Sequence, residues 1–364
     1  MSKKTKIICT VTNDLNYDQR MIRICRSLAT NGYEVTLVGI QKKNSPTLIS
    51  QSFQQKRIPV FFESGKLFYL EYNLKLLFWL LFSKVDILCA IDLDTIVPVY
   101  YASVFRGKKR VYDAHELFTE MQEVMSRPMI YKVWQWVERT YVKRFPVGYT
   151  VGAGIADIFK QRYGVQYALV RNITVRTPLS FPTEKKRYIL YQGAVNVGRC
   201  FEYLIPAMKE VSVPLIICGE GNFFEQAKAI MHEHGLLDKV FFKGYVPPEE
   251  LKEYTRNAYI GITLFEAMGT SNKYSLANRF FDYLHSAVPQ LCVKYPEYIA
   301  INNEFEVAHL IEEPTASAIA KGLNQLLNDT DYYNRLQQNC LRARDVFCWQ
   351  HEEQTLLNVY HSLG

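Results

Sequence analysis

The chain has 364 residues, of which 48% are hydrophobic and 22% charged. This composition is typical of a soluble globular protein, and the length predicts two domains, because single hydrophobic cores stop growing beyond about 250–300 residues. The eight cysteines form no CxxC pair, which argues against a zinc site or a disulfide framework and favours reduced core thiols in the cytoplasm. The start is basic, but its apolar stretch is too short for a signal peptide.

The net charge of +7 is divided unevenly along the chain. Residues 1–186 hold 28 Lys and Arg against 15 Asp and Glu, a net +13, whereas residues 187–364 hold 15 against 21, a net −6. A basic half beside an acidic half indicates that one domain meets an anionic surface, such as membrane lipid or nucleic acid. The alternative is a random spread of surface lysines.

The first half of the chain alternates strands with helices. Five runs rich in β-branched and apolar residues predict strands at 6–12, 33–40, 85–92, 109–116 and 147–152. Helical patterns lie between them at 18–31, 94–105 and 128–144. This alternation predicts a parallel sheet that is covered on both faces by helices.

A further helical pattern, residues 66–82, is apolar almost throughout. Its longest uninterrupted apolar run is seven residues, far short of the about 20 that a membrane-spanning helix needs. One interpretation is a helix buried against the sheet. The other is a helix that dips into the membrane interface, with Lys66, Lys75 and Lys84 at the headgroups. The stretch 132–144 leaves the same two alternatives open.

Residues 171–187 break the alternation, since they are polar, contain prolines and show no period. After them it restarts, with strands predicted at 188–193, 214–221, 239–246, 258–265 and 289–293. The predicted fold is therefore α/β, with two doubly wound domains. The expected division is an N-terminal domain at 1–172, a linker at 173–186, a C-terminal domain at 187–348, and a helix at 349–364 that closes the second domain or crosses back to the first.

Ligands of open parallel sheets bind where strands end and helices begin. The stretch QGAVNVGR follows the first strand of the second half. Its Gly193 and Gly198 let the backbone approach a ligand closely, and Arg199 is placed to pair with a phosphate. The alternative is a tight strand–helix turn with a solvated arginine.

The stretch YSLANRFFDYLHSAVP (274–289) predicts a helix with polar groups near its start. Ser275 is the expected N-cap, which leaves the amides of Ala277 and Asn278 pointing outward as a seat for phosphate. The spacing places Ser275, Asn278 and Asp282 on one helix face, about 10 Å apart from first to last. A nucleoside diphosphate spans that interval, so Asp282 would accept hydrogen bonds from ribose hydroxyls while Arg279 neutralises the diphosphate.

These motifs resemble a known family. NRFFDYLHSAVP is similar to the NK-x-F-E/D-Y segment of glycosyltransferase family 4, whose members have the GT-B fold, and the order GAVNVGR, CGEG, FFKGYVPPEEL, SLANRFFDY is similar to that family's C-terminal domain. The N-terminal stretches VTNDLNYDQRMIRICRSLATNGYEVTLVG and YDAHE resemble a bacterial branch of it. The resemblance covers nearly the whole chain. It implies two Rossmann-like domains facing each other across a cleft, the first binding the acceptor and the second the nucleotide sugar.

The resemblance also implies roles for individual residues. Asp282 stands where the family has the second Glu of its E-x7-E motif, a ribose ligand, and His115 matches a histidine that faces the donor sugar. The implied catalytic residues are His115, Arg199 and Arg279. The implied donor-binding residues are Gly193, Asn196, Gly198, Gly244, Tyr245, Val246, Ser275, Leu276, Ala277, Asn278 and Asp282. The implied acceptor side comprises Asn13, Asp14, Arg20 and Glu116.

Without the family, two of these residues have simpler interpretations. Asp282 would be a carboxylate on a helix surface, and His115 a core histidine bonded to Asp113 or Glu116. Two positions also depart from the family pattern, because Tyr274 replaces the first Glu of E-x7-E and Ala194 occupies one place of the usual basic pair. No acidic pair or histidine cluster in the sequence predicts a metal site.

The expected function is transfer of a sugar, with retention, from a nucleotide-diphosphate donor to a hydroxyl of a glycan or lipid-linked acceptor in surface polysaccharide synthesis. By the resemblance the donor is a UDP- or GDP-sugar, no cofactor or metal is required, and no nucleic acid partner is expected. The expected location is the cytoplasm, peripheral at the inner membrane face. The alternatives are a nucleic-acid-binding protein that uses the basic half, a GT-B protein that binds nucleotide sugar without turnover, and a GT-B sugar-nucleotide epimerase.

Overall fold

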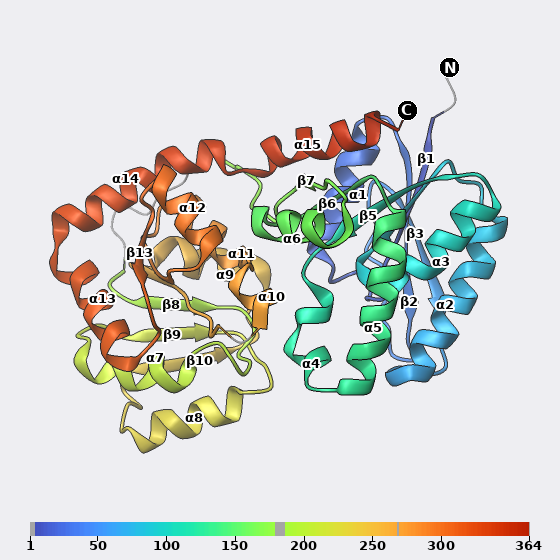
Figure 1. Ribbon diagram of the computed structural model, residues 1–364. Helices are drawn as coiled ribbons and strands as arrows, with labels where there is room; N and C mark the ends of the chain where they lie inside the picture. Colours follow the sequence, from blue (N-terminus) through green and yellow to red (C-terminus); the bar gives the residue numbers. More distant parts are fainter. Residues whose placement is uncertain (1–3, 179–185, 268, 364) are drawn as a thin grey trace. The chain divides into compact units, whose positions relative to one another are not determined.

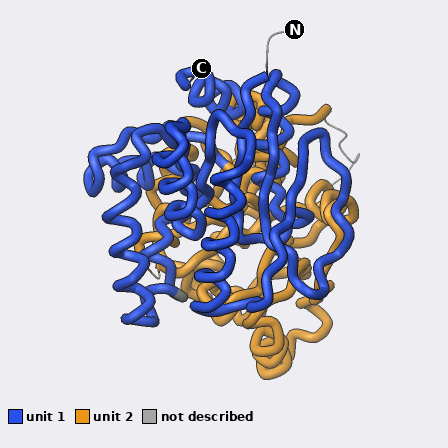
Figure 2. Tube along the Cα trace, turned by 90° about the vertical axis from the view of Figure 1, so that its right-hand side faces the viewer, with its two compact units in different colours: residues 1–171, 352–364 blue, residues 172–351 orange. Residues whose placement is uncertain are grey.

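The computed structural model describes residues 4–178, 186–267 and 269–363. The chain divides into two compact units (Figure 2). Unit 1 comprises residues 1–171 and 352–364, and unit 2 comprises residues 172–351. Of the predicted linker, residues 179–185 lie outside the described residues.

In its described part, unit 1 is built on a seven-stranded parallel sheet with the order β3-β2-β1-β4-β5-β6-β7 (Figure 1). Its strands are β1 (Lys6–Thr10), β2 (Glu34–Gln41), β3 (Gln54–Pro59), β4 (Ile87–Ile91), β5 (Lys109–Ala114), β6 (Gly148–Thr150) and β7 (Ala168–Leu169). Its helices are α1 (Gln19–Thr30), α2 (Gly65–Phe82), α3 (Asp92–Phe105), α4 (Gln122–Met125), α5 (Pro128–Tyr141) and α6 (Ala153–Tyr163), with short 3-10 turns at Phe118–Glu120 and Val142–Arg144. The strand order changes direction between β1 and β4, which is where doubly wound sheets place their ligands.

The described part of unit 2 repeats this plan with a six-stranded parallel sheet, order β10-β9-β8-β11-β12-β13. Its strands are β8 (Ile189–Gln192), β9 (Leu215–Cys218), β10 (Val240–Gly244), β11 (Ile260–Thr263), β12 (Gln290–Val293) and β13 (Ala308–Ile311). Its helices are α7 (Phe201–Ala207), α8 (Phe224–Glu233), α9 (Pro248–Asn257), α10 (Gly269–Lys273), α11 (Asn278–His285), α12 (Pro296–Glu304), α13 (Ala316–Asn328) and α14 (Thr330–Val346), with a 3-10 turn at Met208–Glu210. Here the order reverses between β8 and β11.

The last helix, α15 (Trp349–His361), begins in the residue range of unit 2 and ends in that of unit 1. Its end packs on unit 1 through aromatic contacts, since the ring centre of Tyr360 lies 6.2 Å from that of Tyr33 and 6.4 Å from that of Tyr149. Glu352 pairs with Arg171 at 2.7 Å. These contacts fasten the last turns of the chain to the sheet of unit 1.

The predicted α/β fold with two doubly wound parallel sheets is confirmed. Within the described residues the sequence missed three strands, β3, β7 and β13, and all three lie at sheet edges. Edge strands are less buried than central ones, so they need no continuous apolar run: β3 reads QQKRIP and β7 has two residues. The cysteines expected in core strands are buried, as the apolar runs around them predicted.

Candidate functional site

Two arginines converge in unit 2 where strands of its sheet end. Arg199 follows β8 and Arg279 lies in the first turn of α11, after β11. Both guanidinium groups stack on the ring of Phe265, with guanidinium carbon to ring-centre distances of 4.4 Å for Arg199 and 4.6 Å for Arg279. Arg279 also lies 4.7 Å from the ring centre of Tyr191. The aromatic rings therefore hold two like charges close together.

Neither arginine has a carboxylate within ion-pair distance among the described residues. Arg279 is only 8% exposed. It donates to the hydroxyl of Tyr191 at 3.4 Å and to the carbonyl of Leu264 at 3.3 Å, while its buried Nε has no hydrogen-bond partner in the described part of the chain. Burial lowers the pKa of Arg199, and the charge of Arg279 lowers it further. Uncompensated charge of this kind is costly in a free protein and is relieved when an anion binds.

Gly193 lies directly beside Arg279. Its φ is +119°, a backbone conformation that favours glycine, and a Cβ added there would lie 3.4 Å from Nη1 of Arg279. A side chain at this position would therefore extend over the guanidinium. Glycine leaves that side of Arg279 open, which agrees with the predicted close approach of a ligand to the backbone.

The structure corrects the predicted start of the 274–289 helix. The helix, α11, begins at Asn278 with Ala277 as its N-cap, and the hydroxyl of Ser275 donates to the carbonyl of Asn272 at 2.9 Å. The acceptor, Asn272, belongs to the short helix α10, which ends two residues before Ser275. Ser275 therefore lies outside α11 and does not share a helix face with Asn278 and Asp282. The amide of Ala277, expected to face a phosphate, donates to the hydroxyl of Tyr298 at 3.1 Å.

Asp282 lies on α11 in a hydrogen-bonded network rather than as a solvated surface group. Its carboxylate accepts from the hydroxyl of Thr174 at 2.7 Å and from Nε2 of Gln192 at 3.1 Å. Gln192 is the last residue of β8 and in turn accepts from Thr255 at 2.7 Å. The network holds a half-buried carboxylate at the end of β8, one turn along α11 from Arg279. Its predicted contact with ribose stays a prediction.

Apart from Leu276, the remaining predicted donor residues lie where two strands, β8 and β10, end. In the loop after β8, Asn196 accepts from the amide of Asn222 at 3.0 Å, which holds the loop in place, and the carbonyl of Gly198 accepts from the amide of Glu266 at 3.0 Å. The stretch at the end of β10 consists of Gly244, Tyr245 and Val246. There Gly244 has a φ of +65° and the Tyr245 amide donates to Glu220 at 3.2 Å. Leu276 lies between α10 and α11.

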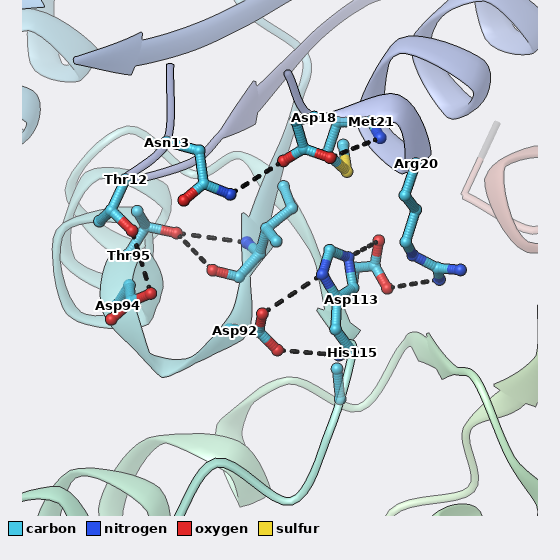
Figure 3. A network of polar contacts seen from close by, with 12 residues as sticks. Thr12, Asn13, Asp18, Arg20, Met21, Asp92, Asp94, Thr95, Asp113 and His115 are labelled. Carbon is cyan, nitrogen blue, oxygen red and sulfur yellow. Dashed lines mark hydrogen bonds and ion pairs between the residues drawn. The ribbon is translucent and has the colours of Figure 1, made fainter. Parts of the chain in front are cut away.

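A second polar cluster lies in unit 1, around His115 (Figure 3). Its ring contacts two carboxylates, with Nε2 3.0 Å from Asp113 and Nδ1 3.3 Å from Asp92. The His115 amide also donates to Asp92 at 2.8 Å. Asp113, whose side chain is fully buried, pairs in addition with Arg20 at 2.9 Å. Two cations and two carboxylates thus form one connected network.

Charge and burial in this network set its protonation. Burial lowers the pKa of His115, but the charges of Asp113 and Asp92 outweigh burial and raise it to about 9. Burial raises the pKa of Asp113, and here the charges of Arg20 and His115 outweigh it, so the pKa is lowered. His115 is therefore an imidazolium at neutral pH, and its Nε2 donates to Asp113 while Nδ1 forms an ion pair with Asp92.

The sequence prediction missed Asp92 and Asp94, which begin α3 directly after β4. Asp92 has a φ of +51°, unusual for a residue other than glycine, and this turn directs its carboxylate to His115. Asp94 accepts from the hydroxyl of Thr12 at 3.0 Å, and its other carboxylate oxygen is buried and has no hydrogen-bond partner among the residues that the structure describes. Burial raises the pKa of Asp94 to about 7. The sequence signal was the pair of acids at the end of an apolar strand.

The residues predicted for the acceptor side of unit 1 separate into different contacts. Arg20 is 5% exposed and supports the His115 network from the interior. Asn13 donates to Asp18 at 3.2 Å, and Asp14 pairs with Arg57 of β3 at 2.6 Å. Glu116 is half-buried next to His115 and raises the pKa of Asp92 through its charge, after the larger effect of burial and against the opposing charge of His115.

No group of three or more His, Cys, Asp or Glu side chains in the described part of the chain is arranged to hold a metal ion. In unit 2, the side chains that bring positive charge to the candidate site are Arg199 and Arg279, which stack on Phe265, with Gly193 next to Arg279.

Residues 179–342 match the model of the family Glycosyl transferases group 1. One curated relative, an uncharacterized glycosyltransferase of Methanocaldococcus jannaschii, is 23% identical over 194 residues. That alignment covers 49% of this chain and 45% of the relative, so the chain spans about half the length of the curated relative it matches.

Solved structures of similar fold cover nearly the whole chain. Sucrose-phosphate synthase from Thermosynechococcus elongatus has a TM-score of 0.81 at 14% identity, with 99% of both chains covered. Anabaena HepE in complex with UDP and glucose has a TM-score of 0.75 at 14% identity, covering 98% of this chain and 100% of that one. S. aureus TarM, in complex with Fondaparinux, alpha-GlcNAc-glycerol and UDP, has a TM-score of 0.70 at 12% identity, covering 98% and 99%. The chain thus shares the fold of these solved structures, with two Rossmann-like α/β units, and residues 179–342 in its second half match the model of glycosyl transferases group 1.

Proposed function

We propose that the protein is a glycosyltransferase that moves a sugar from a nucleotide-diphosphate donor to a hydroxyl of an acceptor. The observation that carries the proposal is the pair Arg199 and Arg279, which lies beside Gly193 without a carboxylate partner in the described residues. A diphosphate supplies the negative charge that this pair lacks. As the sugar departs, charge develops on the diphosphate, and preorganised cations stabilise that charge most strongly in the transition state.

A UDP-sugar is the proposed donor, with a GDP-sugar as the alternative. Two relatives of the same fold were solved with UDP, namely HepE, also with glucose, and TarM, also with alpha-GlcNAc-glycerol. In this chain the diphosphate is proposed to lie against Arg279 and Arg199, and the ribose hydroxyls to donate to Asp282. The nucleobase is proposed to border Gly244, Tyr245 and Val246.

The proposed reaction retains the configuration of the transferred sugar. The acceptor oxygen forms a bond to the anomeric carbon on the face from which the diphosphate leaves, and the departing phosphate oxygen takes the acceptor's proton. The two arginines neutralise the leaving group, so no metal step is invoked. The proposed role of His115 is electrostatic, since its ring is held as an imidazolium by Asp113 and Asp92.

The acceptor is proposed to be a glycan or a lipid-linked glycan, bound by unit 1. Asp94 supports this assignment, because one of its carboxylate oxygens is buried without a hydrogen-bond partner in the described residues, while the other accepts from the hydroxyl of Thr12. Such an oxygen can accept a hydrogen bond from a sugar hydroxyl. We also propose that the protein works in the cytoplasm, at the inner membrane face, in surface polysaccharide synthesis.

The first test is the thermal shift of the protein with UDP, GDP, ADP, CMP and dTDP. A rise in Tm with one nucleotide and not the others is the expected result, and it identifies the donor base. The matching sugar nucleotides are then incubated with and without glycan acceptors, and the anomeric configuration of any product is read by NMR. Donor turnover without acceptor would favour the epimerase, and binding without turnover the non-catalytic protein. The absence of any shift at millimolar nucleotide would contradict the proposal.

A further inference from the structure

Helix α2 has two apolar faces, of which the fold uses one. The buried face consists of Phe68, Tyr72, Leu76 and Leu80, spaced four residues apart. A second set is exposed: Leu67, Leu70, Leu74 and Phe78. At 100° per residue this second set lies on the side of the helix opposite the first. A helix that only covered a sheet would carry polar residues there.

Exposed apolar side chains also lie on the neighbouring helices of unit 1. Helix α3 contacts both α2 and α5 (Figure 1). On α5 the exposed apolar side chains recur at intervals of four and three residues, at Met129, Val133 and Trp136. At the end of α3, Val104 and Phe105 are exposed as well. We call these side chains of α2, α3 and α5 the apolar face.

Aromatic contacts join the three helices below this face. The rings of Tyr69 on α2 and Trp134 on α5 lie 5.3 Å apart between centres. Tyr100 on α3 lies 5.3 Å from Tyr141 on α5. The three helices therefore form one packed layer, and the exposed stripes of α2 and α5 belong to a single rigid support.

Basic side chains flank the apolar face. Lys66 lies in the first turn of α2 and Lys84 follows its end, and both are exposed. On α5, Lys132 and Arg139 are exposed, and Lys143 follows that helix. Among the acids of these two helices, Glu71 is paired with Lys75 and Glu138 is buried. The net charge around the apolar face is therefore positive.

We infer that the apolar face docks on the surface of an anionic lipid bilayer. Leucine, phenylalanine and tryptophan on one side of surface helices, with lysines beside them, match what a bilayer interface offers: hydrocarbon below and anionic headgroups at its edge. The charge favours this occupant over a second copy of the chain, because two copies would bring the same lysines together. No helix in the described residues is long and apolar enough to cross a membrane, and the inferred mode is attachment to one leaflet.

The inference does not depend on sugar transfer, because vesicle binding is measured without donor or acceptor. The full chain is sedimented with vesicles of phosphatidylcholine alone and of phosphatidylcholine mixed with phosphatidylglycerol. Binding to the mixed vesicles is expected, weakening as salt is raised. Equal or absent binding to both kinds of vesicle would overturn the inference.

Two sets of variants locate the surface. The triple variant Leu70→Ser, Leu74→Ser, Phe78→Ser is expected to lose binding, by about tenfold for each side chain that no longer enters the bilayer. Its control is Leu237→Ser in unit 2, since Leu237 is 57% exposed and Leu70 59%. The pair Lys66→Glu and Lys84→Glu is expected to bind about fivefold more weakly for each lysine lost. Lys209→Glu and Lys321→Glu, which change the net charge equally from unit 2, are its control and should bind as wild type.

The same samples separate lipid docking from self-association. Sedimentation equilibrium of the wild type and of the triple variant gives the oligomeric state of each. A dimer that dissociates in the triple variant would show that a second copy covers the apolar face, and would overturn the inference. Thermal unfolding confirms that each variant is folded, and the nucleotide-induced shift in Tm, a property of unit 2, is expected to stay unchanged.

Discussion

Each unit of the protein holds a pair of cations near the carboxyl ends of its strands, and the two pairs are neutralised differently. In unit 1, Arg20 and His115 are matched by Asp113 and Asp92. In unit 2, Arg199 and Arg279 stack on aromatic rings without a carboxylate partner among the described residues. The first pair is satisfied in the free protein and contributes to stability. The second pair lacks counter-charge, so its partner is expected to come from a bound ligand.

Removing the shared carboxylate of unit 1 should have the largest effect. Asp113→Ala leaves Arg20 buried without its counter-charge, and breaking a buried pair from one side costs about 3–5 kcal/mol. We expect the free energy of unfolding to fall by that amount, measured by urea denaturation of the transition assigned to unit 1. The control is Asp345→Ala, which removes an ion pair to Arg176 that is exposed on both sides and should cost at most about 1 kcal/mol. Equal losses in the two variants would contradict the contrast between a buried and an exposed pair.

The pH dependence of stability isolates His115. Its pKa in the folded protein is about 9, above its ordinary 6.5. Between these values the folded state keeps a proton that the unfolded state has lost, so stability falls as pH rises from about 6.5 to 9. The loss is on the order of 2–3 kcal/mol.

The measurement is the difference in unfolding free energy between wild type and His115→Gln across that pH range. Other titrating groups are common to both proteins and cancel, apart from Asp92, Asp113 and Glu116, which face the ring. The difference is expected to shrink as pH rises toward 9, where His115 loses its proton, and also to shrink below about pH 7, where Asp92 takes up a proton and its ion pair with His115 is lost. A difference that does not change with pH would mean that His115 is not held as an imidazolium.

The sequence predicted more of the fold than of the sites. Central strands carry continuous apolar runs and were recognised, whereas the edge strand β3 is polar and was not. Arg199 and Arg279 were selected because both follow strands of the sheet, and their binding role stays a prediction. Ser275 was wrongly predicted as the N-cap, because a local N-cap pattern cannot reveal that its hydroxyl donates to a carbonyl of α10 instead. The Asp113 pairing to Arg20 joins residues 93 apart in sequence, a contact that no local pattern contains.

Removing one cation of unit 2 should affect ligand binding and leave stability nearly unchanged. Arg279→Met keeps an apolar side chain against Phe265 and Tyr191 and relieves the repulsion with Arg199. We expect unfolding of the free protein to change by less than about 1 kcal/mol, and nucleotide binding to weaken by about 2 kcal/mol, or about 30-fold. Calorimetric titration with the nucleotide identified by thermal shift gives the affinity.

Arg335→Met is the matched control, since Arg335 is an exposed arginine of unit 2 that is paired with Glu306. It should leave nucleotide affinity unchanged. If Arg279→Met bound nucleotide as tightly as wild type, the unpaired cations would not be the diphosphate site. If Arg279→Met instead unfolded the protein, Arg279 would be needed for the stability of unit 2, as Arg20 is expected to be for unit 1.

The smallest expected effect concerns Asp282, which has hydrogen-bond partners inside the fold and is also proposed to bind the ligand. It accepts hydrogen bonds from Thr174 and Gln192 inside unit 2, so Asp282→Ala should cost about 1 kcal/mol of stability even without ligand. Its proposed contact with ribose is tested by a thermodynamic cycle that combines Asp282→Ala with removal of the ribose hydroxyls. Wild type and variant are each titrated with the ribonucleotide and with its dideoxy form. Wild type should prefer the ribose form by about 1 kcal/mol, and the variant should not discriminate. An equal preference in both proteins would leave Asp282 with its internal partners alone and would place the ribose elsewhere in the donor site.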